Sequence, residues 1–193
     1  MKYVFMALLG LALPVGAMAQ PAWQPTRDVE VTYHLTGKTP PGTQGDTVKM
    51  GFTSGSKRTW VEPPGQKVRM IVDRPAGKML VIMNEQHSYM EMPYDPKKVM
   101  TFNGSEAKFT RTGTATIAGV GCTTYDVQSP QQVSTVCLTD DGVLLKAVSG
   151  DPAHPGGLEA VSVRYGAQPA SAFAAPDGYQ KMDMSRMGRA PGG

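Results

Sequence analysis

Few residues of this sequence belong to the types that commonly carry out chemistry. The chain of 193 residues holds two cysteines, three histidines and 13 methionines. The histidines are isolated from one another, and none belongs to an H-E-x-x-H spacing or a similar metal-ligand pattern. We therefore expect that the histidines form no metal site and that each lies on the surface or at a strand edge. They are His34, His87 and His154.

No segment has the pattern of a catalytic nucleophile or a nucleotide-binding loop. Ser54 lies in GFTSG, one position away from the G-x-S-x-G spacing and without a strand-to-helix elbow. The stretch GVGCTT opens a strand, whereas a dinucleotide fingerprint opens a helix. The carboxylates form no recognisable acid–base pair. We therefore predict a protein that is not an enzyme and has no cofactor, although motifs do not detect a site assembled from distant residues.

Cys122 and Cys137 are the only cysteines. A hairpin centred on Ser129-Pro130 would place them directly opposite each other, because they lie equally far from that centre. Opposed Cβ atoms of the closer pair type are near enough for a disulfide. We predict a structural disulfide between them; a redox role would favour a C-x-x-C pair, which is absent, and free thiols are the remaining alternative.

Methionine is unusually frequent, and most of its copies fall in predicted strands. A flexible thioether fills irregular cores, and it also suits surfaces that accept varied apolar partners. Met90 and Met92 share one face of their strand, as do Met79 and Met83. Core filling is one interpretation, and a pliable concavity for lipid or peptide is the other. The candidate ligand-binding residues are Met50, Met70, Met79, Met83, Met90, Met92 and Met100.

A third interpretation of the methionines is copper binding. Met182, Met184 and Met187 lie close together near the C-terminus, and soft thioethers favour Cu(I). No histidine or cysteine stands beside them, so this hypothesis rests on the spacing of the methionines alone.

The first 19 residues have the organisation of a secretory signal peptide. Lys2 precedes an apolar run from residue 4 to 17, and Ala17 and Ala19 form an A-x-A cleavage site before Gln20. A lipoprotein would carry a cysteine after the cleavage point, so we expect a free periplasmic protein. No later segment is long and apolar enough to span a membrane, and we expect no stable span after cleavage.

The rest of the chain reads as one β-rich domain, residues 20–184, followed by a disordered tail, residues 185–193. Abundant glycine (22) and proline (16) favour short strands and many turns. The strands follow one another closely, which favours antiparallel pairing, and Asp140-Asp141-Gly142 fits a hairpin loop with a left-handed glycine.

The net charge is +3, and the basic residues form no cluster that would suit nucleic acid. Strands are predicted from Val29 to Leu35 and at 46–53, 57–62, 67–73, 78–83, 86–92, 107–118, 121–128, 133–139, 143–149 and 158–166.

One or two short helices are expected beside the sheet. Asp95 fits an N-cap, Pro96 fits the first helical position, and Asn103-Gly104 would end that helix after Phe102. A second helical turn is expected at residues 170–173.

Three segments resemble a known group of proteins: QHSYMEMPYDP, CLTDDGVLLKAV and LEAVSVRYGAQPASAFAAPDGYQKM. They are similar to exported proteins with a domain of unknown function, related to the periplasmic lipoprotein-carrier superfamily (LolA/LolB-like). Proteins of this group end with a strand, a short characteristic phrase and a final short strand, and here that phrase runs from Ala172 to Tyr179. It implies a mainly β fold (α+β): a single curved antiparallel sheet that forms an incomplete barrel, with its concave apolar face partly covered by helices.

The leading functional hypothesis is a periplasmic, non-catalytic binding or accessory protein that holds an apolar ligand on the concave sheet. The partner would be a lipid or an acylated peptide, and no nucleic acid. The rival hypothesis is an envelope interaction or scaffold protein that binds another envelope protein and has no ligand.

Overall fold

The computed structural model describes residues 20–37, 45–65, 67–95, 107–129, 133–153 and 155–183. The expected signal peptide, residues 1–19, and the expected disordered tail, residues 185–193, lie outside these ranges. Most of the predicted helix that starts at Asp95 also lies outside them, as do His154, Met100, Met184 and Met187.

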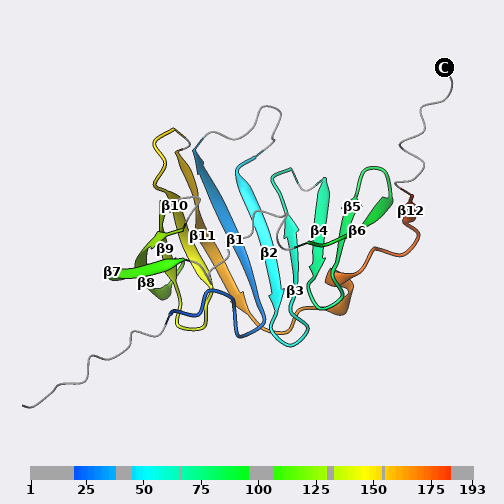
Figure 1. Cartoon of the computed structure of the whole chain (residues 1–193). Helices are drawn as coiled ribbons and strands as arrows, with labels where there is room; N and C mark the ends of the chain where they lie inside the picture. The colour runs from blue at the N-terminus through cyan, green and yellow to red at the C-terminus, as the bar shows by residue number, and fades with distance from the viewer. Residues whose placement is uncertain are drawn as a thin grey trace, which may run out of the picture.

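The described chain folds into a single sheet of twelve strands (Figure 1). Its order is β12-β6-β5-β4-β3-β2-β1-β11-β10-β9-β8-β7. The strands are β1 (Val29–Gly37), β2 (Thr47–Thr53), β3 (Arg58–Glu62), β4 (Val68–Asp73), β5 (Lys78–Met83), β6 (Ser88–Pro93), β7 (Lys108–Ile117), β8 (Val120–Gln128), β9 (Val133–Leu138), β10 (Leu144–Ser149), β11 (Gly156–Tyr165) and β12 (Gln180–Met182).

Two meanders make up this sheet, and β1 and β11 join them. Strands β1 to β6 pair in sequence order, and so do β7 to β11, because short turns connect antiparallel neighbours. Antiparallel pairing of β1 with β11, from Val29 opposite Tyr165 to Gly37 opposite Gly156, closes the two halves into one sheet. Within β1, the buried Val29, Val31 and Tyr33 alternate with more exposed neighbours, which is the period expected of a strand with one buried face.

The mainly β, single-sheet prediction is confirmed, and each predicted strand coincides with an observed one to within a few residues. Two details differ. Strand β12 pairs with β6 in parallel, because the chain crosses from β11 over the sheet before it returns to the edge. The expected short helices are not borne out as α-helices: the described residues form none, and Ala170–Phe173 makes one turn of 3₁₀ helix, η2. Pro169 precedes that turn and an extended Ala174 ends it.

The predicted disulfide forms between Cys122 and Cys137, whose Cα atoms lie 5.5 Å apart. The predicted register was wrong, however. Cys137 lies opposite Thr124, so the two cysteines are diagonal neighbours on β8 and β9 and not directly opposed. The predicted loop after β9 is confirmed: Gly142 has φ +84°, and the Val143 N–H donates to the Thr139 hydroxyl at 2.8 Å.

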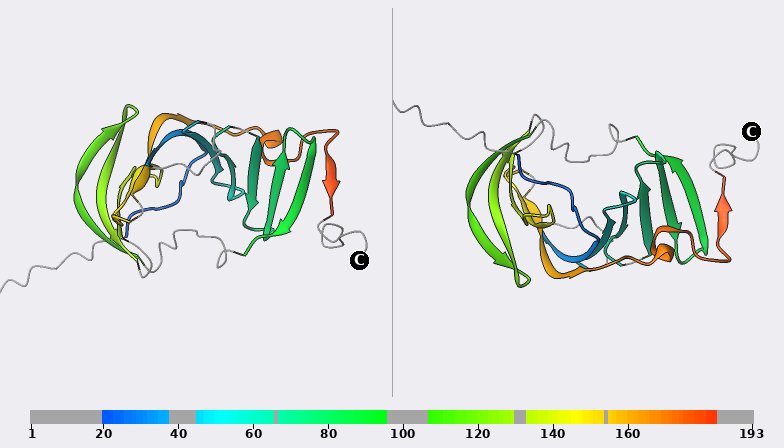
Figure 2. Two further views of the ribbon diagram at one scale, coloured as in Figure 1. Left: turned by 90° about the horizontal axis from the view of Figure 1, so that it is seen from above. Right: turned by 90° about the horizontal axis from the view of Figure 1, so that it is seen from below.

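The sheet is strongly bent, and different segments cover its two faces. Figure 2 shows residues 20–28 crossing the inside of the bend, while the segment that contains η2 runs along the outside. We call these the inner and outer faces. On the outer face the buried Trp60, Ile71 and Ile82 form a core with side chains that follow β11, including Phe173 and Tyr179. The inner face carries the candidate site.

Candidate ligand-binding cavity

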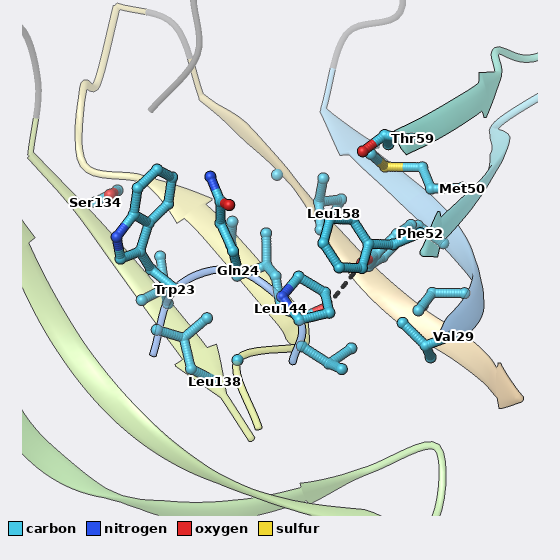
Figure 3. A pocket seen from close by; sticks show the side chains of 18 of the residues that line it. Trp23, Gln24, Val29, Met50, Phe52, Thr59, Ser134, Leu138, Leu144 and Leu158 are labelled. Carbon is cyan, nitrogen blue, oxygen red and sulfur yellow. Dashed lines mark hydrogen bonds between the residues drawn. The ribbon is translucent and has the colours of Figure 1, made fainter. Parts of the chain in front are cut away.

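A cavity of about 600 Å³ opens on the inner face (Figure 3). Most of its wall comes from β1, β2, β9, β10 and β11, with single residues from β3 and β7, and residues 23–25 of the N-terminal segment lie across it. Its volume falls within the roughly 300–1,000 Å³ usual for small-molecule sites. The described residues that contribute most of the apolar wall are Trp23, Val29, Val31, Met50, Phe52, Phe109, Val136, Leu138, Val143, Leu144, Ala147, Val148 and Leu158.

The N-terminal segment is held in place at several points. Trp23 packs against the cluster formed by Ala107, Val127, Val136 and Leu138. Thr26 donates its backbone N–H to the Asp141 carbonyl at 2.9 Å. The Arg27 guanidinium lies 4.1 Å from the centre of the Tyr165 ring. These contacts make the segment a wall of the cavity.

Gly142 lets the β9–β10 loop approach this segment closely. A Cβ at this position would lie 2.3 Å from the Gln24 carbonyl oxygen, and the backbone φ of +84° also disfavours a side chain. The loop and residues 23–25 can therefore meet only with glycine here.

Tyr33 supplies one polar group of the wall, and that group is already paired. Its hydroxyl donates to the Leu144 carbonyl oxygen at 2.8 Å, the bond drawn in Figure 3. Burial raises the pKa of Tyr33 far above its ordinary value. Tyr33 therefore stays neutral and ties β1 to β10 across the cavity.

Two other residues of the lining each have a buried polar atom without a hydrogen-bond partner among the described residues. The hydroxyl of Thr59 and the Nε of Arg74 are both buried and unpaired. Arg74 is the one charged side chain among the described residues that line the cavity.

The methionines of β2, β4, β5 and β6 all share the inner face. Directly opposed residues of neighbouring strands lie on the same side of a sheet. One row of opposed residues runs Met50, Val61, Met70, Val81, Met90. The row beside it includes Phe52, Thr59, Val72, Met79 and Met92, and Val68 and Met83 form a third opposed pair. We call this apolar surface the methionine face; its methionine and valine side chains are half-buried.

The cavity and the methionine face meet at Met50 and Phe52. Of the methionines predicted to bind ligand, Met50 lines the cavity, whereas Met70, Met79, Met83, Met90 and Met92 lie farther along the same face. Met182 of β12 lies opposite Met90 and extends the row to the sheet edge. The apolar inner surface is thus continuous from β11 to β12.

Sequence reasoning missed most of the cavity wall. Trp23, Tyr33, Phe52, Val136 and Leu158 come from segments far apart in the chain, and no motif connects them. The alternation in β1 marked Val31 and Tyr33 as facing one side, but only the strand order shows what they face.

The two described histidines lie apart from the cavity lining. His34 Nδ1 lies 3.1 Å from a carboxylate oxygen of Asp46 on the surface, and the His87 ring packs against Tyr179 at 5.4 Å between ring centres. Within the described ranges, no group of three or more His, Cys, Asp or Glu side chains could hold a metal ion. No helix among the described residues is long and apolar enough to cross a membrane.

A family model described as "Domain of unknown function (DUF4412)" matches residues 46–149, from the start of β2 to the end of β10. No curated protein sequence matches the chain significantly.

Solved structures share the fold at low sequence identity. An uncharacterized conserved protein from Thermus thermophilus is 10% identical, with a TM-score of 0.55 over 81% of this chain and 90% of that one. MucB is 15% identical, with a TM-score of 0.51 over 82% of this chain and 60% of MucB. PNGF-II is 15% identical, with a TM-score of 0.50 over 83% of this chain and 32% of PNGF-II. This chain thus corresponds to about 60% of MucB and a third of PNGF-II. The expected resemblance to the LolA/LolB-like fold is confirmed at the level of fold.

Proposed function

The chain belongs to the DUF4412 family, whose description assigns no activity, and we propose that this protein is a non-catalytic binding protein of the periplasm that holds the acyl chain of a lipid or acylated peptide. The site would be the inner-face cavity. The methionine face would extend it for longer or bulkier apolar groups.

The cavity is the observation that carries this proposal. A packed β-sheet protein normally fills its interior at close to crystal density, yet a space of about 600 Å³ stays open against Val31, Phe52 and Leu158. Apolar walls with few polar groups are typical of small-molecule sites. Transfer of each methylene group from water into such a site contributes about 0.8 kcal/mol, so a long acyl chain would bind there without many polar contacts.

The methionine face supports the same proposal. Methionine side chains adapt to ligands of different shape because they have three rotatable bonds and a polarizable sulfur. Six methionines share the inner face with the cavity, from Met50 on β2 to Met92 on β6. A surface of this kind would accept chains of varied length.

A periplasmic location remains part of the proposal. The expected signal peptide at residues 1–19 would export the chain, and a disulfide such as Cys122–Cys137 persists in oxidising compartments. The ligand would then be an apolar molecule of the cell envelope.

Organic extraction of the mature protein purified from periplasm, followed by mass spectrometry, tests the proposal. Met50→Lys places a cation in the cavity, and Met90→Lys places one on the methionine face away from it. Val161→Lys is the matched control, because Val161 is 59% exposed and outside the cavity lining. We expect stoichiometric lipid in the wild type and in the control, and none in Met50→Lys. Loss of lipid in Met90→Lys as well would extend the site over the methionine face.

The absence of lipid from a folded wild type, together with no binding of added acyl chains, would reject the proposal. The envelope scaffold hypothesis would then be favoured, with the half-buried methionine face as its contact surface. The copper hypothesis remains a separate prediction, because two of its three methionines lie outside the described residues. A Cu(I) titration of the full chain beside a variant that lacks residues 184–193 would test it.

A further inference from the structure

Thr59 and Arg74 both line the cavity, and we call the part of the wall near them the polar corner. Each of these side chains also has a buried polar atom without a hydrogen-bond partner among the described residues: the Thr59 hydroxyl and Arg74 Nε. A buried polar group that lacks a partner destabilises a protein by about 1–3 kcal/mol, and a charged one by more. Native proteins keep few such groups, and these two belong to side chains that line a largely apolar cavity, in which Arg74 is the one charged side chain among the described residues.

The strand register places these two residues at the same end of the β3–β4 pair. Thr59 of β3 lies opposite Val72 of β4, on the inner face. Arg74 follows Val72 by two residues, just beyond the end of β4 and on the same end of the β3–β4 hairpin. Side chains two residues apart along an extended chain point to the same side, so Arg74 is directed towards the face that carries Thr59.

Within the described ranges, no carboxylate forms an ion pair with Arg74. The adjacent acid, Asp73, is already engaged: one oxygen accepts from Arg58 Nε at 2.7 Å, and the other accepts the Ala76 N–H at 3.0 Å. Lys57, the residue just before β3, adds positive charge at the same end of the hairpin. This corner of the cavity is therefore cationic and would attract an anion.

We propose that the cavity binds a long-chain carboxylate, with the carboxylate held by Arg74 and Thr59 and the alkyl chain lying along the apolar wall. The Nε–H and a neighbouring Nη–H of a guanidinium form a planar pair of donors that fits the two oxygens of a carboxylate. The Thr59 hydroxyl supplies a third donor. In Figure 3, Thr59 and Phe52 lie on one side of the cavity and Trp23 on the other, with Leu158 between them. The chain would run from the polar corner past Phe52 towards Trp23. This inference rests on the proposed function and specifies its ligand.

Paired probes test it on the delipidated, full mature protein. Hexadecanoate carries the anion, and hexadecan-1-ol has the same chain without it. Binding is followed by tryptophan fluorescence, to which Trp23 in the cavity lining contributes, and verified by calorimetry. The variants are Arg74→Gln, Arg74→Lys and Thr59→Val. Lys57→Gln is the control, because it removes the same charge from an exposed side chain nearby that is not part of the lining.

We expect Arg74→Gln to weaken hexadecanoate binding roughly 10- to 100-fold, the usual effect of losing charge-assisted hydrogen bonds. Thr59→Val should weaken it less, and Arg74→Lys should restore part of the affinity. Binding of hexadecan-1-ol, and of hexadecanoate to Lys57→Gln, should change less than about 3-fold because neither depends on these hydrogen bonds.

Each other outcome overturns the inference in a distinguishable way. If hexadecanoate and hexadecan-1-ol bind equally well, and Arg74→Gln binds both as the wild type does, the cavity is a site for acyl chains that does not recognise an anionic head group. Binding of neither probe by the wild type would reject the proposed function as well. Tighter binding of hexadecyl phosphate than of hexadecanoate, lost in Arg74→Gln, would assign the corner to a lipid phosphate. If Arg74→Gln does not fold, Arg74→Lys and Thr59→Val still decide between these results.

Discussion

Gly51 lies opposite Trp60 across β2 and β3, and the Trp60 indole occupies the space where a side chain at Gly51 would be. A Cβ added to Gly51 would stand 2.1 Å from Trp60 Nε1. Trp60 belongs to the outer-face core and is only 4% exposed, so it has little room to move. We expect Gly51→Ala to lower the free energy of unfolding by about 1–3 kcal/mol, as overpacking of a core does. Urea denaturation followed by fluorescence measures this change.

Gly55→Ala is the matched control for that substitution. Nothing lies within 4 Å of a Cβ at Gly55. Its effect on the free energy of unfolding should be within about 0.5 kcal/mol. Equal effects of the two substitutions would contradict the packing argument.

Removal of the disulfide should destabilise the protein substantially. Cys122 and Cys137 are both buried and close a segment with a sequence separation of 15. Cys122→Ala combined with Cys137→Ala should lower the free energy of unfolding by about 3 kcal/mol, mostly through the unfolded chain. A reductant should destabilise the wild type similarly and leave the double variant unchanged. A reduced wild type of unaltered stability would refute this expectation.

Tyr33 should make the protein less stable in alkali. Its pKa in the folded state lies above its unfolded value of about 10 because the phenol is buried. The folded state therefore retains a proton that the unfolded state releases, and stability falls as the pH rises above about 10. Tyr33→Phe should lower the free energy of unfolding by about 1 kcal/mol at neutral pH, through loss of the bond to Leu144. It should also flatten the alkaline decline. Urea midpoints at neutral and alkaline pH measure both effects, and equal slopes would contradict the second.

Glu91 should control how firmly the edge strand β12 stays paired. Its two carboxylate oxygens lie 3.0 Å from Lys78 Nζ on β5 and 3.2 Å from Lys181 Nζ on β12. Hydrogen bonds from Lys78 and then Lys181 lower the pKa of Glu91. Its contribution is therefore present above the unfolded pKa and is lost as the pH falls through the lowered folded value.

Glu91→Gln should therefore speed hydrogen exchange of the β12 amides at neutral pH. Gln180, whose N–H donates to the His87 carbonyl oxygen at 2.9 Å, is the reporter. Glu85→Gln is the control, since Glu85 pairs with Lys67 and not with β12. Equal protection of Gln180 in all three proteins would show that this pair of lysines does not hold the edge.

The strands were predictable because their alternation is local. Val29, Val31 and Tyr33 indicate one buried face whatever the neighbours are, and glycine or proline marks most turns. The register of β8 and β9 was not predictable in the same way. Moving the centre of a hairpin by one residue shifts the pairing by two, and a shift of two keeps each side chain on its own face. The two cysteines therefore lie on the same face in both the predicted and the observed register. The sequence pattern could not distinguish these two registers.

The candidate site was less predictable than the sheet. Sequence periodicity placed Met90 and Met92 on one face, and the observed register aligns them with Met50 and Met70. Arg74 and Thr59 gave no signal, since a lone arginine after a strand is an ordinary surface residue. Only the packed structure shows that their polar atoms are buried without partners.

The junction of β1 with β11 also constrains how this chain can fold. In the described sheet no strand from β2 to β6 pairs with a strand from β7 to β10, so each meander can form early from local contacts. The two meanders can join only when β11 pairs with β1, and these two strands lie far apart in the sequence. Contacts between such distant segments form slowly, because the chain must lose the entropy of closing a long loop before these contacts can stabilise it. The cavity, whose walls come from both meanders, would be the last part of the molecule to form, and ligand present at that step would favour the closed sheet.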